Sequence, residues 1–208
     1  MGEHVADVYD KIYLKDEKRY GVEPLSIVRE LAHILSPGCS IFEIGAGHGR
    51  NSLFLSSNGF DVTAADISPR AVELLARGAQ ERQTNMKSMF FNAAHDQIPG
   101  VFDAIISTFV FHHLSDAEAH KAIRHMQYAT HSGGVNLILS FTKNGMFYQN
   151  NPETGDFFLE TKEDLAEMYR GWDIIKLFEH AGRARSLGSE GSSELQPNVF
   201  AGLLARKP

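Results

Sequence analysis

The stretch Phe42-Glu43-Ile44-Gly45-Ala46-Gly47-His48-Gly49 decides the fold class of this chain. A short apolar strand runs into the glycines, and a helix is predicted directly after them. Glycines at such a turn permit positive φ angles and let the backbone approach a ligand closely. Asp66 ends the next predicted strand, about 20 residues further on, where an open α/β sheet places an acid that binds ribose hydroxyls. These residues predict a site for an adenosine-containing ligand.

Glu43 indicates which adenosine-containing ligand is expected. A dinucleotide fingerprint has the form G-x-G-x-x-G and receives a pyrophosphate at the helix N-terminus. Here the third glycine, Gly49, comes one position early, and Arg50 follows it. A carboxylate two residues before the first glycine would repel a pyrophosphate but suits a ligand with an ammonium or sulfonium group. The residues therefore favour S-adenosylmethionine over NAD.

Short apolar runs alternate with helical patterns along most of the chain. Such alternation predicts a parallel sheet covered on both faces, an α/β doubly wound fold. The expected helices span residues 24–35, 50–58 and 115–130, with others beginning at Ser68 and Thr161. The expected strands span residues 40–44, 61–65, 89–91, 102–111, 135–141, 172–178 and 199–205. Residues 143–155 and 181–198 are predicted loops, and the second leaves no room for a crossover helix, so the last two strands should pair antiparallel.

The composition of the 208 residues excludes several classes of protein. Twenty basic against 26 acidic side chains give a net charge of −6, which disfavours a nucleic-acid binder with a broad basic face. The single cysteine, Cys39, excludes a disulfide framework and fits a cytoplasmic location. No apolar stretch approaches the length of a membrane span. The ten histidines show no metal-ligand spacing, so no metal is expected.

Several segments resemble class I S-adenosylmethionine-dependent methyltransferases, and more closely their tellurite-resistance (TehB-like) branch. The class resemblance covers about residues 40–141, through E-x-G-x-G-x-G, Asp66, Phe102-Asp103 and Gly133-Gly134. The branch resemblance lies in Gly49-Arg50-Asn51-Ser52-Leu53, Asn58-Gly59-Phe60-Asp61-Val62, Tyr169-x-Gly171-Trp172 and Leu204-Ala205-Arg206-Lys207. It implies a Rossmann-like sheet of about seven strands in the order 3-2-1-4-5-7-6, with one strand antiparallel.

The resemblance also assigns roles to individual residues. It places the methionine part of the cofactor at the glycine loop, the ribose at Asp66, the adenine at residues 67 and 92–93, and the sulfonium near residues 108–109. Asn92 stands where the class usually has an acid. The cofactor-binding residues expected in this way are Glu43, Gly45, Ala46, Gly47, Gly49, Asn51, Asp66, Ile67, Asn92, Ala93, Thr108 and Phe109.

Candidate catalytic and substrate residues lie outside this set. The tellurite branch has a His-Arg pair after the sixth strand, whereas this chain has Arg185 and Ser186 there. Arg183 and Arg185 are candidates to hold an anion through charge-assisted hydrogen bonds, and Tyr20 is a further substrate candidate. His112 and His113 are the candidate general bases, and a packing role is the alternative for both. Adjacent residues on a strand point to opposite faces, so they should not share one ion.

The function expected from the sequence is methyl transfer from S-adenosylmethionine to a small molecule, which leaves S-adenosylhomocysteine. A thiol, tellurite or selenite is the expected acceptor, because a soft or anionic nucleophile needs no strong base. The alternatives are an O- or N-methyltransferase of an organic metabolite, a non-catalytic S-adenosylmethionine-binding regulator, and an NAD-type oxidoreductase. One domain is expected over residues 1–208, with an N-terminal cap or lid (1–36), a cofactor-binding core (40–141) and a substrate-side part (142–208). A monomer or homodimer without nucleic-acid or membrane partners is expected.

Overall fold

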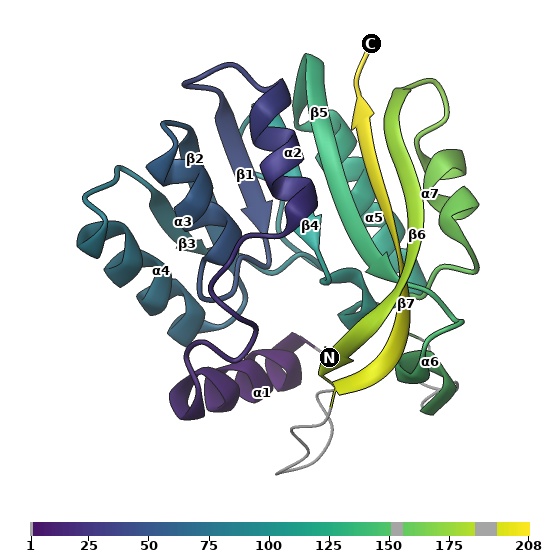
Figure 1. Cartoon of the computed structure of the whole chain (residues 1–208), viewed down its shortest axis with the longest axis horizontal. Helices are drawn as coiled ribbons and strands as arrows, with labels where there is room; N and C mark the ends of the chain where they lie inside the picture. The colour runs from purple at the N-terminus through teal and green to yellow at the C-terminus, as the bar shows by residue number, and fades with distance from the viewer. Residues whose placement is uncertain (1, 151–155, 186–194) are drawn as a thin grey trace.

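The computed structural model describes residues 2–150, 156–185 and 195–208, and a seven-stranded sheet forms its centre (Figure 1). The strand order is β3-β2-β1-β4-β5-β7-β6. β7 is antiparallel to both of its neighbours, and the other neighbouring strands are parallel. This confirms the predicted fold class and strand order. The strands are β1 (Ser40–Ile44), β2 (Asp61–Asp66), β3 (Lys87–Phe90), β4 (Phe102–Thr108), β5 (Thr130–Phe141), β6 (Asp173–Arg185) and β7 (Leu195–Arg206).

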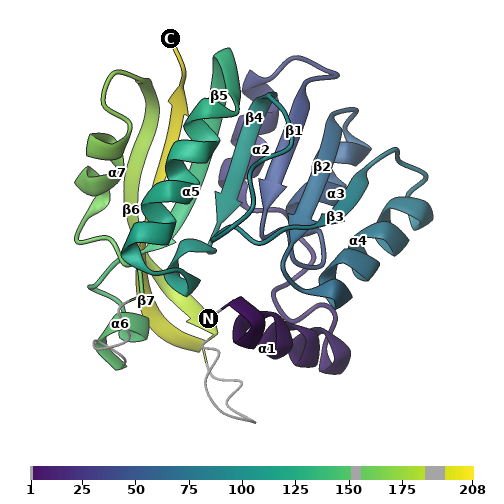
Figure 2. The same cartoon turned by 180° about the vertical axis from the view of Figure 1, so that it is seen from behind.

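Helices cover both faces of the sheet and one of its ends (Figures 1 and 2). Apolar side chains of α2, α3 and α4 pack on one face, and those of α5 and α7 pack on the other. α1 and α6 lie at the end where the parallel strands finish. The helices are α1 (Gly2–Lys15), α2 (Ser26–Ile34), α3 (Arg50–Ser57), α4 (Pro69–Glu81), α5 (Asp116–Tyr128), α6 (Met146–Asn150) and α7 (Lys162–Met168).

Local sequence signals explain how the helices near the site begin. Ser68 accepts a hydrogen bond from the Ala71 N–H, and Pro69 occupies the first helical position of α4. Ser115 and Glu118 form the predicted capping box of α5. These caps fix the helix starts close to the ends of the strands, where the polar side chains of the site gather.

The last two strands are longer than predicted. The expected loop over residues 181–198 is partly strand, because β6 continues to Arg185 and β7 begins at Leu195. Arg183 therefore lies on β6, where it pairs with Pro197, and does not lie in a loop. Residues 186–194 of the expected loop fall outside the described residues. The backbone groups of β6 and β7 pair with each other over this extension. The Gly- and Ser-rich sequence does not predict that pairing.

The fourth strand ends earlier than predicted. β4 stops at Thr108, Phe109 has a φ of +60°, and Phe111–His113 form a short 3₁₀ helix, η1. His112 and His113 therefore do not lie on a strand with opposed side chains, and their ring centroids are 3.8 Å apart. A positive φ at a bulky residue is strained. No signal in the sequence predicts it.

Smaller differences concern the element boundaries. β3 begins two residues before the predicted start, at Lys87, and β5 begins at Thr130, so that Gly133 and Gly134 lie within it. α6 lies in the predicted loop 143–155, of which residues 151–155 fall outside the described residues.

Candidate functional site

A cavity of about 520 Å³ lies where the parallel strands end, between α1 on one side and β6, β7 and α6 on the other. Ligand pockets of about 300–1,000 Å³ are typical of small-molecule sites. Apart from Gly49, every cofactor-binding residue expected from the sequence lines this cavity: Glu43, Gly45, Ala46, Gly47, Asn51, Asp66, Ile67, Asn92, Ala93, Thr108 and Phe109. Four catalytic or substrate candidates line it as well: Tyr20, His112, His113 and Arg183.

The glycine loop forms a wall that leaves no room for side chains. Gly45, Gly47 and Gly49 all have positive φ angles. A Cβ on Gly45 would collide with Val110, and one on Gly47 would lie 2.5 Å from the Tyr13 hydroxyl. Gly49 instead precedes α3 and faces Leu53 and Leu75, so it shapes the turn without lining the cavity.

Glu43 lies fully buried beneath the loop. Its carboxylate accepts hydrogen bonds from the Asn51 amide (2.8 Å) and from the Ser52 hydroxyl. Burial raises the pKa of Glu43 to about 7, although these two hydrogen bonds oppose the shift. Asn51 also accepts from the Leu25 N–H at 3.1 Å, so one amide links β1, α3 and the start of α2.

Asp66 is the second buried carboxylate of the cavity. Backbone N–H groups hold it: Gly47 donates to Oδ2 at 2.7 Å, and Ser68 donates to Oδ1 at 2.9 Å. Burial raises the pKa of Asp66, and the backbone hydrogen bonds counteract that rise. The carboxylate thus joins the glycine loop to the end of β2, and both face the same cavity.

The residues expected near the adenine and the sulfonium also face the cavity. The Asn92 side-chain oxygen accepts a hydrogen bond from the Ala94 N–H at 3.0 Å, and the Asn92 N–H donates to Asp96 at 2.7 Å. A carbonyl oxygen has two lone pairs, so Asn92 keeps one for a ligand. The Asn51 side-chain amide donates to the Thr108 hydroxyl oxygen at 3.4 Å, and Thr108 directly precedes the strained Phe109.

His112 and His113 occupy different environments within the same cavity. The His113 Nε2 lies 2.9 Å from the Tyr9 hydroxyl. The His112 Nδ1 is buried and has no hydrogen-bond partner. Burial lowers the pKa of His113 to about 4, and burial together with the neighbouring His113 lowers the pKa of His112 well below its ordinary value. Both imidazoles are therefore uncharged near neutral pH.

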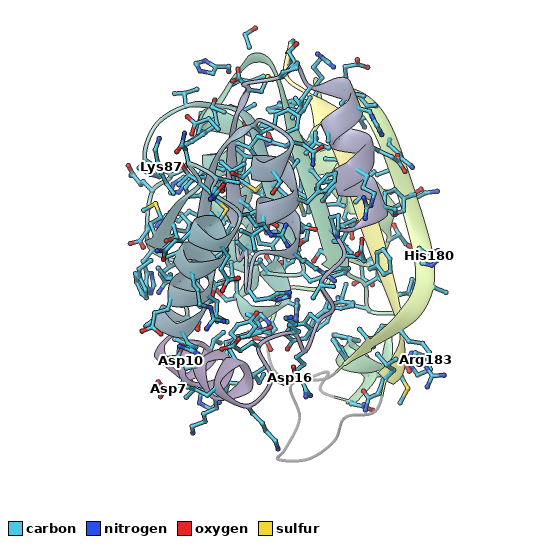
Figure 3. All side chains as sticks on the ribbon, turned by 60° about the vertical axis from the view of Figure 1, so that its left-hand side comes forward. Asp7, Asp10, Asp16, Lys87, His180 and Arg183 are labelled. Carbon is cyan, nitrogen blue, oxygen red and sulfur yellow. The ribbon has the colours of Figure 1, made fainter. Side chains whose placement is uncertain are left out.

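The structure describes the side chain of Arg183 but not that of Arg185. Arg183 is exposed at the lower end of β6 (Figure 3), and its guanidinium donates to the Leu195 carbonyl oxygen at 2.7 Å. Arg185 ends β6, and its side chain and Ser186 lie outside the described residues. Tyr20 lines the cavity, and its carbonyl oxygen accepts from Arg50 at 2.8 Å.

The sequence predicts an N-terminal cap or lid over residues 1–36, in which Tyr9 and Tyr13 are either lid residues or part of a packed amphipathic helix. Both tyrosines line the cavity, and their ring centroids lie 6.0 Å apart. Sequence reasoning missed other residues of the cavity. Arg19 lines the same wall, and its buried Nε has no partner. Phe141, Phe147 and Phe200 also face the cavity, from distant parts of the chain.

Two negative findings hold for the described residues. No group of three or more His, Cys, Asp or Glu side chains there is placed to hold a metal ion. Within residues 2–150, 156–185 and 195–208, no helix combines the length and apolar character that crossing a bilayer requires.

Comparison with known proteins identifies the family. The family model described as "Tellurite resistance protein TehB" matches residues 8–194. The chain belongs to the TehB family. A "Probable S-adenosyl-L-methionine-dependent methyltransferase TehB" of Haemophilus influenzae is 31% identical over 181 residues, covering 86% of this chain and 61% of that protein. The crystal structure of TehB from Haemophilus influenzae has a TM-score of 0.77 at 26% identity, covering 96% of this chain and 67% of that one.

The TehB family belongs to the class I S-adenosylmethionine-dependent methyltransferases, as the sequence resemblance predicts. A second relative, named "Hemagglutinin 1", of Eikenella corrodens, is 31% identical over 92% of this chain and 62% of its own length. This chain thus spans about three fifths of the length of these two curated relatives.

Proposed function

We propose that this TehB-family chain binds S-adenosylmethionine in the cavity and transfers its methyl group to a small-molecule acceptor. The observation that carries the proposal is that the glycine loop and Asp66 lie at one wall of the cavity, where the Gly47 N–H donates a hydrogen bond to the Asp66 carboxylate. A glycine loop at the end of a strand, next to a buried carboxylate at the end of the neighbouring strand, suits an adenosine-containing ligand. The acceptor is a separate question, and thiol, tellurite and selenite stay predictions from the sequence.

Named residues would hold the parts of the cofactor. Asp66 would accept hydrogen bonds from the ribose hydroxyls, and Asn92 would accept from the adenine amino group. Arg19 lines the cavity and would offer its guanidinium to the carboxylate of the methionine part. Glu43 would act from beneath the loop, by holding Asn51 and Ser52 in place.

The chain would accelerate the reaction mainly by positioning. S-adenosylmethionine supplies a methyl group on a sulfonium sulfur, which keeps the electron pair of the broken bond. The cavity walls would bring the acceptor into line and exclude water. Tyr9 and Tyr13 of α1 line the cavity and would contribute to that exclusion.

A turnover assay tests this proposal. The purified protein is mixed with S-adenosylmethionine and a panel of thiols, metalloid oxyanions and phenols, and S-adenosylhomocysteine is quantified by mass spectrometry. We expect release of S-adenosylhomocysteine with at least one acceptor class. Binding of the cofactor without release with any acceptor would indicate a non-catalytic binding module and contradict the proposal.

A further inference from the structure

α1 lies at the end of the sheet without joining the core on either of its faces (Figure 1). In the described part of the chain, no residue of α1 belongs to the two apolar clusters that cover the sheet. The apolar partners of α1 lie instead on α4, where Tyr13 packs with Ala71 and Leu74 in a separate small cluster. The position of α1 therefore depends on its contacts with α4 and on those it makes across the cavity.

Charged groups hold the side of α1 that faces α4. Asp10 accepts hydrogen bonds from the Ser68 hydroxyl and from the Arg70 N–H. Glu17, just after the helix, pairs with Arg70 and Arg77. Hydrogen bonds with an ionised partner are about twice as strong as neutral ones. Together with the apolar cluster, these contacts make α4 the firmer attachment of α1.

A hydrogen bond between Tyr9 and His113 connects α1 to η1 across the cavity. The Tyr9 hydroxyl lies 2.9 Å from the His113 Nε2, and the two rings meet edge to face with centroids 5.5 Å apart. Burial raises the pKa of Tyr9 and lowers that of His113, so neither side chain carries a charge near neutral pH. A neutral hydrogen bond is weaker than the charged contacts at α4. The side of α1 that faces η1 is therefore the side that opens more readily.

α1 also covers the carboxylate that is proposed to hold the cofactor ribose. Tyr13 and Asp66 both line the cavity and are only 3% and 7% exposed. A Cβ on Gly47 would lie 2.5 Å from the Tyr13 hydroxyl, and the Gly47 N–H donates to Asp66, so α1 lies directly against this wall. Movement of α1 is thus the most direct way to uncover the carboxylate.

We propose that α1 is a hinged lid over the cofactor cavity. Its hinge is the attachment to α4, and the Tyr9–His113 hydrogen bond is the clasp that opens when the cofactor enters and when S-adenosylhomocysteine leaves. The inference rests on the proposed function, since it takes the ligand beneath α1 to be the cofactor. Because the clasp joins two parts of the protein, it forms in the closed lid with or without ligand. Tyr9 therefore controls how fast the ligand enters and leaves, and acts through the lid rather than on the ligand.

Binding kinetics test the inference without any turnover. S-adenosylhomocysteine is passed over the immobilised protein, and its association and dissociation rate constants are measured by surface plasmon resonance. Tyr9→Phe keeps the ring but removes the clasp, which favours the open lid both before and after binding. A neutral hydrogen bond shifts such an equilibrium about three- to tenfold. We expect both rate constants to rise by that factor, so that the Kd changes by less than about twofold.

Matched variants separate the clasp from other effects. Tyr128→Phe is the control and should leave both rate constants unchanged, because Tyr128 is 77% exposed on α5 and lies away from the cavity. His113→Phe removes the same hydrogen bond from the other side, so the double variant should release S-adenosylhomocysteine no faster than either single variant.

Three results would each overturn the inference and leave the proposed function intact. They are unchanged rate constants in Tyr9→Phe, a higher Kd with an unchanged association rate constant, and additive effects in the double variant. Failure of the wild-type protein to bind S-adenosylhomocysteine would overturn the proposed function as well.

Discussion

At the scale of single residues, two buried carboxylates share the cavity but differ in their donors. Side chains of α3 donate to Glu43, whereas backbone N–H groups of the glycine loop and of the α4 cap donate to Asp66. Glu43 has a pKa of about 7 and is therefore partly protonated near neutral pH. The difference suits Glu43 to a supporting role under the loop and Asp66 to direct contact with a ligand.

Replacing Glu43 should change the pH dependence of stability. The ordinary pKa of Glu is 4.5, so between pH 4.5 and 7 the folded protein holds a proton that the unfolded chain has lost. The free energy of unfolding therefore falls as the pH rises through this window. Glu43→Gln cannot ionise, so its free energy of unfolding does not fall in this way. The difference in the free energy of unfolding, variant minus wild type, should therefore increase by up to about 3 kcal/mol from pH 4.5 to 7.5. Urea unfolding measures this, with the exposed Glu179→Gln as control. Parallel curves for wild type and Glu43→Gln would contradict the burial argument.

Replacing Asp66 should weaken cofactor binding. Asp66→Asn keeps the size of the side chain but replaces a charged acceptor, and hydrogen bonds to charged groups are worth about 1.5–3 kcal/mol. The Kd of S-adenosylhomocysteine should rise at least about tenfold. Asp61→Asn, at the exposed other end of β2, is the control and should leave the Kd unchanged. An unchanged Kd in Asp66→Asn would remove Asp66 from the site.

At the scale of elements, α1 forms a wall of the cavity and is anchored to α4. Asp10 lies on α1 (Figure 3). Its carboxylate accepts from the Ser68 hydroxyl and, at 3.0 Å, from the Arg70 N–H. Glu17, just after α1, pairs with Arg70 at 2.8 Å and with Arg77 at 2.5 Å. The contacts with α4 thus hold α1, and with it Tyr9 and Tyr13, at the cavity that Asp66 also lines.

Breaking this anchor should loosen α1 alone. Asp10→Ala leaves the Arg70 N–H unpartnered, so amide exchange in α1 should accelerate about tenfold while exchange in β1 stays unchanged. Hydrogen-exchange mass spectrometry measures both segments. Asp7→Ala is the matched control, since Asp7 is exposed on the same helix. Equal exchange in the two variants would show that Asp10 does not anchor α1.

At the scale of the whole molecule, the sequence predicts the framework of the site better than its walls. The glycine loop, Asp66 and the helix caps are local signals, so Gly45, Gly47 and Ser68 could be read directly from the chain. The walls depend on tertiary packing: the tyrosines of α1 and the rings of residues 109, 141, 147 and 200 meet only once the sheet has formed. Phe109, directly after the end of β4, has a strained φ that no signal in the sequence predicts.

Isothermal titration calorimetry of the purified protein with S-adenosylhomocysteine tests the central claim most directly. If the glycine loop and Asp66 bind the cofactor, one molecule of S-adenosylhomocysteine should bind saturably per chain. NADH should give no heat of binding under the same conditions. Absence of binding by S-adenosylhomocysteine, or saturable binding of NADH in its place, would contradict the account.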